Sequence, residues 1–148
     1  MIYLDYSANT PADPAVLDCF CEAERACCGN ANAAHSAGRA AKACVDEATA
    51  SVAALLGVQP EEIIYTSGAS EANNTAIFGL ARAGRHVGRH IISTPLEHPS
   101  VSGCLTALQE QGYEIDLVGI GRDGKVDLEQ LQELLRRDTV LVSITAVD

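Results

Sequence analysis

Short apolar runs alternate with amphipathic segments of helical length in the second half of the chain, and this alternation constrains the fold most. The runs cover residues 63–65, 91–92, 115–118 and 140–144, and the segments between them cover residues 70–83, 99–111 and 127–137. Strands joined by helices of about a dozen residues form right-handed crossovers between parallel neighbours. We therefore expect an α/β fold with a mainly parallel sheet.

Local signals predict several helix boundaries and buried faces. Asp13 before Pro14 is typical of an N-cap and a first helical turn, so we expect a helix that reaches about Cys28. Helical spacing of apolar residues predicts a second helix over residues 36–56, ended by Gly57. In the segment 127–137, Asp127 and Gln130 fit a capping box. The 3.6-residue period predicts two inward faces, formed by Val101, Cys104, Leu105 and Leu108 and by Leu128, Leu131, Leu134 and Leu135.

The charge balance excludes some classes of partner. The chain has 148 residues, with 20 acidic and 10 basic side chains and a formal charge of −10. Binding of nucleic-acid phosphates requires clustered Lys and Arg, which this chain lacks. No apolar stretch approaches the ~18 residues that span a bilayer, and the first residues do not resemble a signal peptide. We expect no nucleic-acid partner and no membrane span.

The six cysteines indicate a reducing compartment more than a disulfide framework. Cys19, Cys21, Cys27 and Cys28 lie in or beside the first predicted helix, yet no pair has Cys-x-x-Cys spacing. A metal site in this group stays open as the less favoured alternative to small apolar packing or surface thiols. Reduced thiols in the cytoplasm fit best.

The segment 66–71 has the chemistry of an anion-binding loop. Gly68 lets the backbone approach a ligand closely, and the next N–H groups point out of the start of a helix. Ser67 and Ser70 add hydroxyl donors, and the helix dipole favours a phosphate. A plain strand-to-helix turn with a serine cap explains the same residues equally well.

A second loop, residues 93–99, follows the next apolar run. His98 precedes Pro99, which suits the first position of a helix, so the imidazole is expected at the same sheet edge as the phosphate loop. A histidine there can stack on a flat ring or move protons. The alternative is a solvent-facing loop histidine. Neither His86 nor His90 has an evident role in a site.

Five motifs occur in an order and spacing that identify a family resemblance. They are residues 3–11 (Tyr-Leu-Asp-Tyr-Ser-Ala-Asn-Thr-Pro), Gly29-Asn30 with His35 and Gly38-Arg39, residues 66–74 (Thr-Ser-Gly-Ala-Ser-Glu-Ala-Asn-Asn), Glu97-His98, and residues 141–144. Over its whole length the chain resembles the N-terminal part of the cysteine desulfurases, the NifS/IscS-like branch of the class-V aminotransferase family.

The resemblance implies pyridoxal 5′-phosphate (PLP) as cofactor, in a three-layer, mainly parallel fold of PLP-dependent transferase type I. Ala69 and Ser70 match the residues that hold the cofactor phosphate. His98 matches the catalytic histidine that stacks on the pyridine ring and takes part in proton transfers. Residues 1–15 match a segment associated with the small domain, and residues 16–148 match an incomplete large domain. Four of that domain's seven strands would be encoded here.

The implied reaction converts L-cysteine to L-alanine and leaves the sulfur as an enzyme persulfide, for iron–sulfur cluster or thio-cofactor assembly. The implied partners are a sulfur-acceptor or scaffold protein and a second copy of the chain in a homodimer. The implied Schiff-base lysine and persulfide cysteine fall beyond position 148. We therefore expect the chain alone to be inactive and marginally folded or oligomeric.

Departures from the family pattern leave two alternatives open. Asn9 replaces a threonine, residues 31–33 replace Pro-Ser-Ser, and Ala146 and Asp148 differ from the expected residues. A selenocysteine lyase or another class-V enzyme is one alternative. A non-catalytic acidic α/β module that binds a partner is the other.

Overall fold

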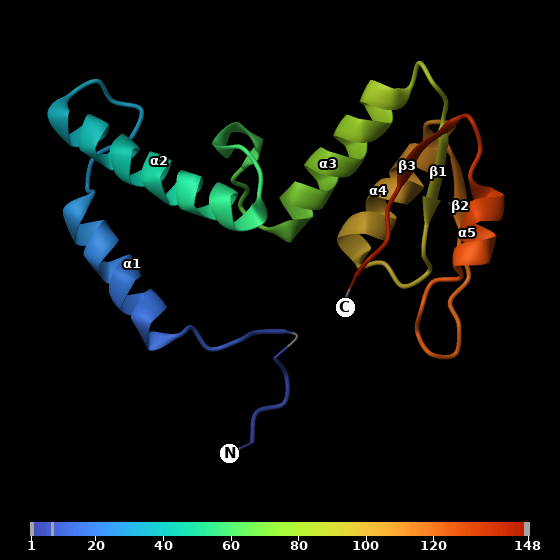
Figure 1. Ribbon diagram of the computed structural model, residues 1–148, viewed down its shortest axis with the longest axis horizontal. Coiled ribbons are helices and arrows are strands. Elements are labelled where there is room, and N and C mark those ends of the chain that lie inside the picture. Colours follow the sequence, from blue (N-terminus) through green and yellow to red (C-terminus); the bar gives the residue numbers. More distant parts are fainter. Residues whose placement is uncertain (1, 7, 147–148) are drawn as a thin grey trace. The chain divides into compact units, whose positions relative to one another are not determined.

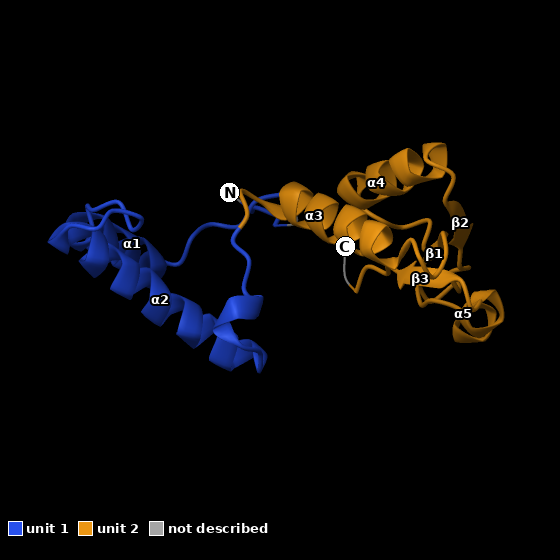
Figure 2. Cartoon of the chain, turned by 90° about the horizontal axis from the view of Figure 1, so that it is seen from above, with its two compact units in different colours: residues 1–65 blue, residues 66–148 orange. Residues whose placement is uncertain are grey.

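The computed structural model describes residues 2–6 and 8–146 (Figure 1). Ser7 of the opening motif and Asp148 therefore lie outside the described residues. The chain divides into two compact units, residues 1–65 and 66–148, which Figure 2 colours blue and orange. No helix of the described residues is long and apolar enough to cross a membrane.

The first unit contains the helices α1 (Pro14–Ala26) and α2 (Ser36–Leu56) and the 3₁₀ turn η1 (Pro60–Glu62). The carboxylate of Asp13 accepts a hydrogen bond from the N–H of Ala15 at 2.8 Å, which confirms the predicted cap of α1. The helix α2 ends at Gly57, whose φ of 69° is left-handed, as the sequence predicts.

The second unit is a parallel sheet between layers of helices. Its strands are β1 (His90–Ser93), β2 (Glu114–Leu117) and β3 (Thr139–Val142), in the order β2-β1-β3. The helices are α3 (Ala69–Gly84), α4 (Pro99–Glu110) and α5 (Leu128–Leu134). Figures 1 and 2 show α3 and α4 on one face of the sheet and α5 on the other. The predicted α/β class with a parallel sheet is confirmed.

The core lies between the central strand and the pair α3 and α4. All of β1 is buried, as expected for a strand with a neighbour on each side and helices over it. The predicted inward face of α4 is confirmed, and it meets residues of α3 and the residue before β2. The core members are Ile77, Ala81, Ile91, Val101, Cys104, Leu105, Leu108 and Tyr113.

Three sequence predictions are wrong. Residues 63–65 form no strand, because no described segment pairs with them, and Ile64 is 73% exposed. The strand count is therefore three and not four. The helix α5 ends at Leu134, where extended backbone at Leu135 leads toward β3. Leu128 and Leu135, which were expected to face inward, are exposed. The side chain of Gln130 accepts from the N–H of Gly119 and not from Asp127, so the capping box is incomplete.

Alanine in place of two glycines is expected to change stability in opposite directions. A Cβ at Gly88 would overlap the backbone carbonyl of Asp138, so Gly88→Ala should lower the free energy of unfolding by about 1–3 kcal/mol. Gly79 lies inside α3 with no atom within 4 Å of its Cβ position, so Gly79→Ala should raise it by about 0.5–1 kcal/mol. Urea unfolding of both variants measures this; equal effects would contradict the close approach at Gly88.

Candidate active site

The helix α3 presents the donors that the phosphate prediction requires. Ala69 and Ser70 are its first two residues, so their N–H groups have no acceptor inside the helix. The Ser70 side chain is exposed at the same end. Gly68 caps the helix, and nothing lies within 4 Å of the position a Cβ would take there. An anion has open access to this helix end.

The Ser67 hydroxyl was expected to donate to a ligand, but it is bound inside its own loop. Its N–H and its hydroxyl both donate to the carboxylate of Glu71, at 2.7 and 2.6 Å. The hydroxyl is therefore engaged within the loop, and Ser70 is the serine left to face a ligand. The bond from the Ser67 hydroxyl, followed by that from its N–H, lowers the pKa of the Glu71 carboxyl.

Glu71 is expected to make the second unit more sensitive to acid. A carboxyl with a lowered folded-state pKa stabilises the fold above the unfolded-state pKa of about 4.3 and loses that effect as pH falls through the folded value. The stability difference between the wild-type chain and Glu71→Gln should therefore shrink below about pH 4.3. Urea unfolding across pH ~2–6 measures it. The exposed Glu133→Gln controls for loss of one charge, and an unchanged difference would contradict the assignment.

The helix α4 begins at the predicted histidine. His98 is its N-cap and Pro99 its first residue, and the imidazole Nδ1 accepts from the N–H of Ser100 at 3.1 Å. This capping bond was not foreseen from the sequence. His98 is exposed at the end of the loop that follows β1, so it lies at the carboxyl edge of the sheet.

A hydrogen bond joins the first turns of α3 and α4. The side-chain amide of Asn73 donates to the hydroxyl of Ser100 at 2.8 Å. Asn73 follows Ser70 by one helical turn, and Ser100 contacts Nδ1 of His98 at 2.9 Å. The structure thus places the donors of Ala69 and Ser70 and the imidazole of His98 at neighbouring helix starts on the same edge of the sheet.

Glu97 fixes the loop that carries His98. Its carboxylate accepts from the hydroxyl of Thr94 at 3.0 Å and from the N–H of Thr145 at 2.8 Å. The loop after β1 is thereby attached to the segment after β3. Sequence reasoning missed the roles of Glu97 and Asn73, although both stand in the motifs it identified; Ser100 stands in none of them.

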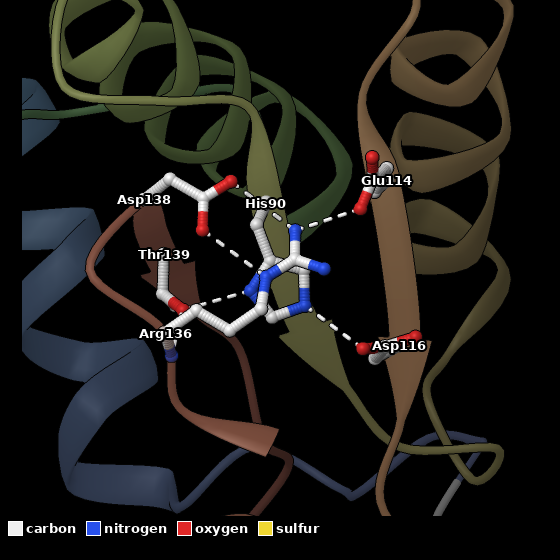
Figure 3. Close-up of polar contacts among 6 residues, drawn as sticks. All are labelled: His90, Glu114, Asp116, Arg136, Asp138 and Thr139. Atoms are coloured by element: carbon white, nitrogen blue, oxygen red, sulfur yellow. Dashed lines mark hydrogen bonds and ion pairs between the residues drawn. The ribbon is translucent and has the colours of Figure 1, made fainter.

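His90 is buried at the opposite edge of the sheet (Figure 3). Its Nδ1 lies 2.7 Å from the hydroxyl of Thr139 and its Nε2 lies 3.0 Å from the carboxylate of Asp116. His90 and Thr139 are the first residues of β1 and β3, whereas Asp116 is the third residue of β2. Beside them, Arg136 is paired with Glu114 and Asp138. The cluster links the three strands and is separate from His98, which follows the other end of β1.

A cavity of about 370 Å³ opens between α4 and β2. Thr94 and Glu97 contribute to its wall, with apolar residues such as Leu105 and Ile115. Ala69, Ser70 and His98 do not line it. This cavity is therefore distinct from the starts of α3 and α4, which carry the predicted site residues.

The comparisons with known proteins agree with the motifs. A model of the aminotransferase class-V family matches residues 2–148. The chain belongs to the aminotransferase class-V family. The "Putative cysteine desulfurase IscS 1" of Bacillus subtilis (strain 168) is 41% identical over 143 residues, which are 97% of this chain and 38% of that protein.

Solved structures of this family have the same fold. A "NIFS-LIKE PROTEIN" matches with a TM-score of 0.94 and 37% identity, over 99% of this chain and 40% of that one. A structure described as "SspA in complex with cysteine" matches with a TM-score of 0.87 and 32% identity, over 96% of this chain and 41% of that one. The chain thus spans about two fifths of the length of these relatives. The expected PLP-dependent type I fold is confirmed for this portion.

The residues at the helix starts fit PLP, on which this family depends. Two free helical N–H groups and the Ser70 hydroxyl form a donor set for a phosphate, and Gly68 leaves the approach open. The imidazole of His98 supplies a flat group at the adjoining helix start. Among the described residues, no three His, Cys, Asp or Glu side chains are grouped so that they could hold a metal ion.

Two cysteine thiols have raised pKa values. The hydrogen bond that the Cys27 thiol shares with Cys44, then burial, raises the pKa of Cys27, and burial raises that of Cys104. A raised pKa reduces the thiolate fraction and so makes a thiol a poorer nucleophile.

Proposed function

We propose that this chain is the N-terminal portion of a PLP-dependent cysteine desulfurase, with residues 16–148 contributing to the large domain and residues 1–15 associating with the small one. The reaction is conversion of L-cysteine to L-alanine, with the sulfur retained as an enzyme persulfide. Relatives named as cysteine desulfurases support the proposal, as does a structural neighbour described with cysteine. The observation that carries it is the bond from Asn73 to Ser100, which sets Ser70 and His98 on adjoining helix starts.

Each residue has a defined part in this proposal. Ala69 and Ser70 hold the cofactor phosphate through their N–H groups and the Ser70 hydroxyl. His98 would face the ring and would contribute a hydrogen-bonding nitrogen next to the reacting atoms. When bound, PLP supplies an electron-withdrawing ring that stabilises negative charge on the amino-acid substrate. The family resemblance implies that the nucleophilic cysteine and the lysine that carries PLP lie beyond position 148.

Partners and location remain predictions. A second copy of the chain and a protein that accepts sulfur, for iron–sulfur cluster or thio-cofactor assembly, are the expected partners. A cytoplasmic location follows from the reduced cysteines predicted from the sequence.

Substitution of Ser70 tests the proposal. In the complete gene product, Ser70→Ala should weaken PLP binding about 10-fold or more, because a hydrogen bond to a charged phosphate is lost. Ser102→Ala, an exposed serine in α4, is the matched control and should bind PLP like the wild type. Bound PLP is measured by its visible absorbance during titration, and alanine and sulfide are measured with L-cysteine as substrate.

Each outcome of this experiment has one meaning. A complete product that binds no PLP contradicts the proposal and favours a non-catalytic module. If the complete product turns over selenocysteine faster than cysteine, the function is that of a selenocysteine lyase and not that of a cysteine desulfurase. Steady sulfide release by residues 1–148 alone contradicts the assignment of this chain as an incomplete enzyme.

A further inference from the structure

Two helices of the described residues begin with a histidine N-cap, and the two caps differ in their donors. Nδ1 of His35 accepts from the N–H of Gly38 at 3.1 Å at the start of α2. Nδ1 of His98 accepts from the N–H of Ser100 at the same distance. His98 has a further contact, because the hydroxyl of Ser100 lies 2.9 Å from the same nitrogen.

The direction of the hydrogen bonds around His98 follows from the donors present. The side-chain NH₂ of Asn73 donates to the oxygen of Ser100 at 2.8 Å, and an amide NH₂ is a donor only. The hydroxyl hydrogen of Ser100 is therefore available for Nδ1. The backbone N–H of Ser100 is also a donor only, so Nδ1 must present its lone pair. Both hydrogen bonds to Nδ1 require a ring in which Nδ1 carries no proton.

A neutral imidazole carries one N–H, and the lone pair at Nδ1 places it on Nε2. We propose that Asn73 and Ser100 are positioning residues that hold His98 in the Nε2–H tautomer, so that the ring offers a hydrogen-bond donor to an anionic substrate or cofactor atom. This inference rests on the proposed place of His98 beside the cofactor. The acceptor class is a carboxylate or phenolate oxygen or a thiolate sulfur.

The arrangement also limits what His98 does as a base. Nε2 already holds the proton, so it has no lone pair to accept another. Protonation at Nδ1 removes the acceptor of both bonds and breaks the cap of α4. The neutral ring therefore acts at Nε2 as a donor, and proton uptake by His98 is tied to loss of the contacts with Ser100.

The tautomer of each histidine is measurable without cofactor or substrate. We would label the complete gene product, prepared without PLP, with ¹⁵N-histidine and record long-range ¹H–¹⁵N correlations at alkaline pH, where an ordinary imidazole is neutral. His98→Gln identifies the His98 signals by their loss. His35 is the internal reference, because its Nδ1 is held by a backbone N–H alone.

Three variants distinguish the effect of the side chains of Asn73 and Ser100 on the tautomer from the effect of the backbone N–H that caps α4. Ser100→Ala removes the hydroxyl, Ser100→Thr keeps it, and Asn73→Asp makes the hydroxyl donate to a carboxylate in place of Nδ1. The ratio of Nε2–H to Nδ1–H tautomer at His98 should exceed that at His35 in the wild type. It should fall about 2- to 10-fold in Ser100→Ala and Asn73→Asp and be retained in Ser100→Thr.

The His35 ratio should stay constant in all variants, which shows that each variant is folded at α2. A dominant Nδ1–H tautomer at His98 in the wild type would overturn the inference. An unchanged ratio in both Ser100→Ala and Asn73→Asp would overturn it as well. Failure of the complete product to bind PLP would refute the proposed function and leave this measurement unaffected.

Discussion

Leu108→Ala is expected to lower the free energy of unfolding by about 3–5 kcal/mol. Leu108 is 0% exposed and belongs to the cluster between α3, α4 and β1. Truncation removes buried methyl groups and leaves a cavity, because the helices over the sheet close it only in part. Small domains are stabilised by about 5–15 kcal/mol in total, so such a loss consumes a large share.

Urea unfolding followed by far-ultraviolet circular dichroism measures this change. Leu128→Ala is the matched control: the same substitution at a leucine of α5 that is 68% exposed. Its effect should stay within about 0.5 kcal/mol. Similar losses in the two variants would contradict the placement of the core on the α3 and α4 side of the sheet.

His98→Asn is expected to lower turnover of L-cysteine by the complete enzyme about 10²- to 10³-fold, the range for loss of one positioned hydrogen-bond donor at a developing negative charge. Asparagine is a good N-cap residue, so the start of α4 should persist without the imidazole. The loss then reflects the missing ring and not an unfolded helix. Because the phosphate donors at Ala69 and Ser70 remain, PLP should still bind.

His86→Asn is the control, since His86 is exposed in the turn between α3 and β1. It should leave turnover and PLP binding unchanged. Alanine formation from L-cysteine and PLP absorbance measure the two properties separately. Full activity in His98→Asn would remove His98 from the proposed mechanism, whereas loss of PLP alone would assign it to binding.

The site could be predicted only in part from the sequence. Gly68, Ala69 and Ser70 stand in a motif whose chemistry is local, since a helix start exposes its own N–H groups. His98 was placed correctly before Pro99 at the start of α4. Ser100, which contacts His98, is only two residues away, but the bond from Asn73 to Ser100 joins residues 27 apart that no periodicity links. The assignment of these residues to PLP stays a prediction until the cofactor titration is done.

His90 shows the same limit at the other sheet edge. Its sequence context indicates no role, yet Asp116 and Thr139 bind its two ring nitrogens from 26 and 49 residues away. Those contacts exist because the parallel register sets His90 opposite Glu114 and Thr139. Strand pairing of this kind is a non-local property.

The sequence by itself determined the local elements of this protein: the cap at Asp13, the end of α2 at Gly57, and the buried face of α4. These follow from backbone preferences and from a 3.6-residue period, both of which act within a few residues. Tertiary structure decided which apolar runs became strands, and residues 63–65 did not, because a strand exists only with a hydrogen-bonded neighbour. It also decided which nitrogen of His98 carries the proton, because that depends on donors from α3 and α4 together.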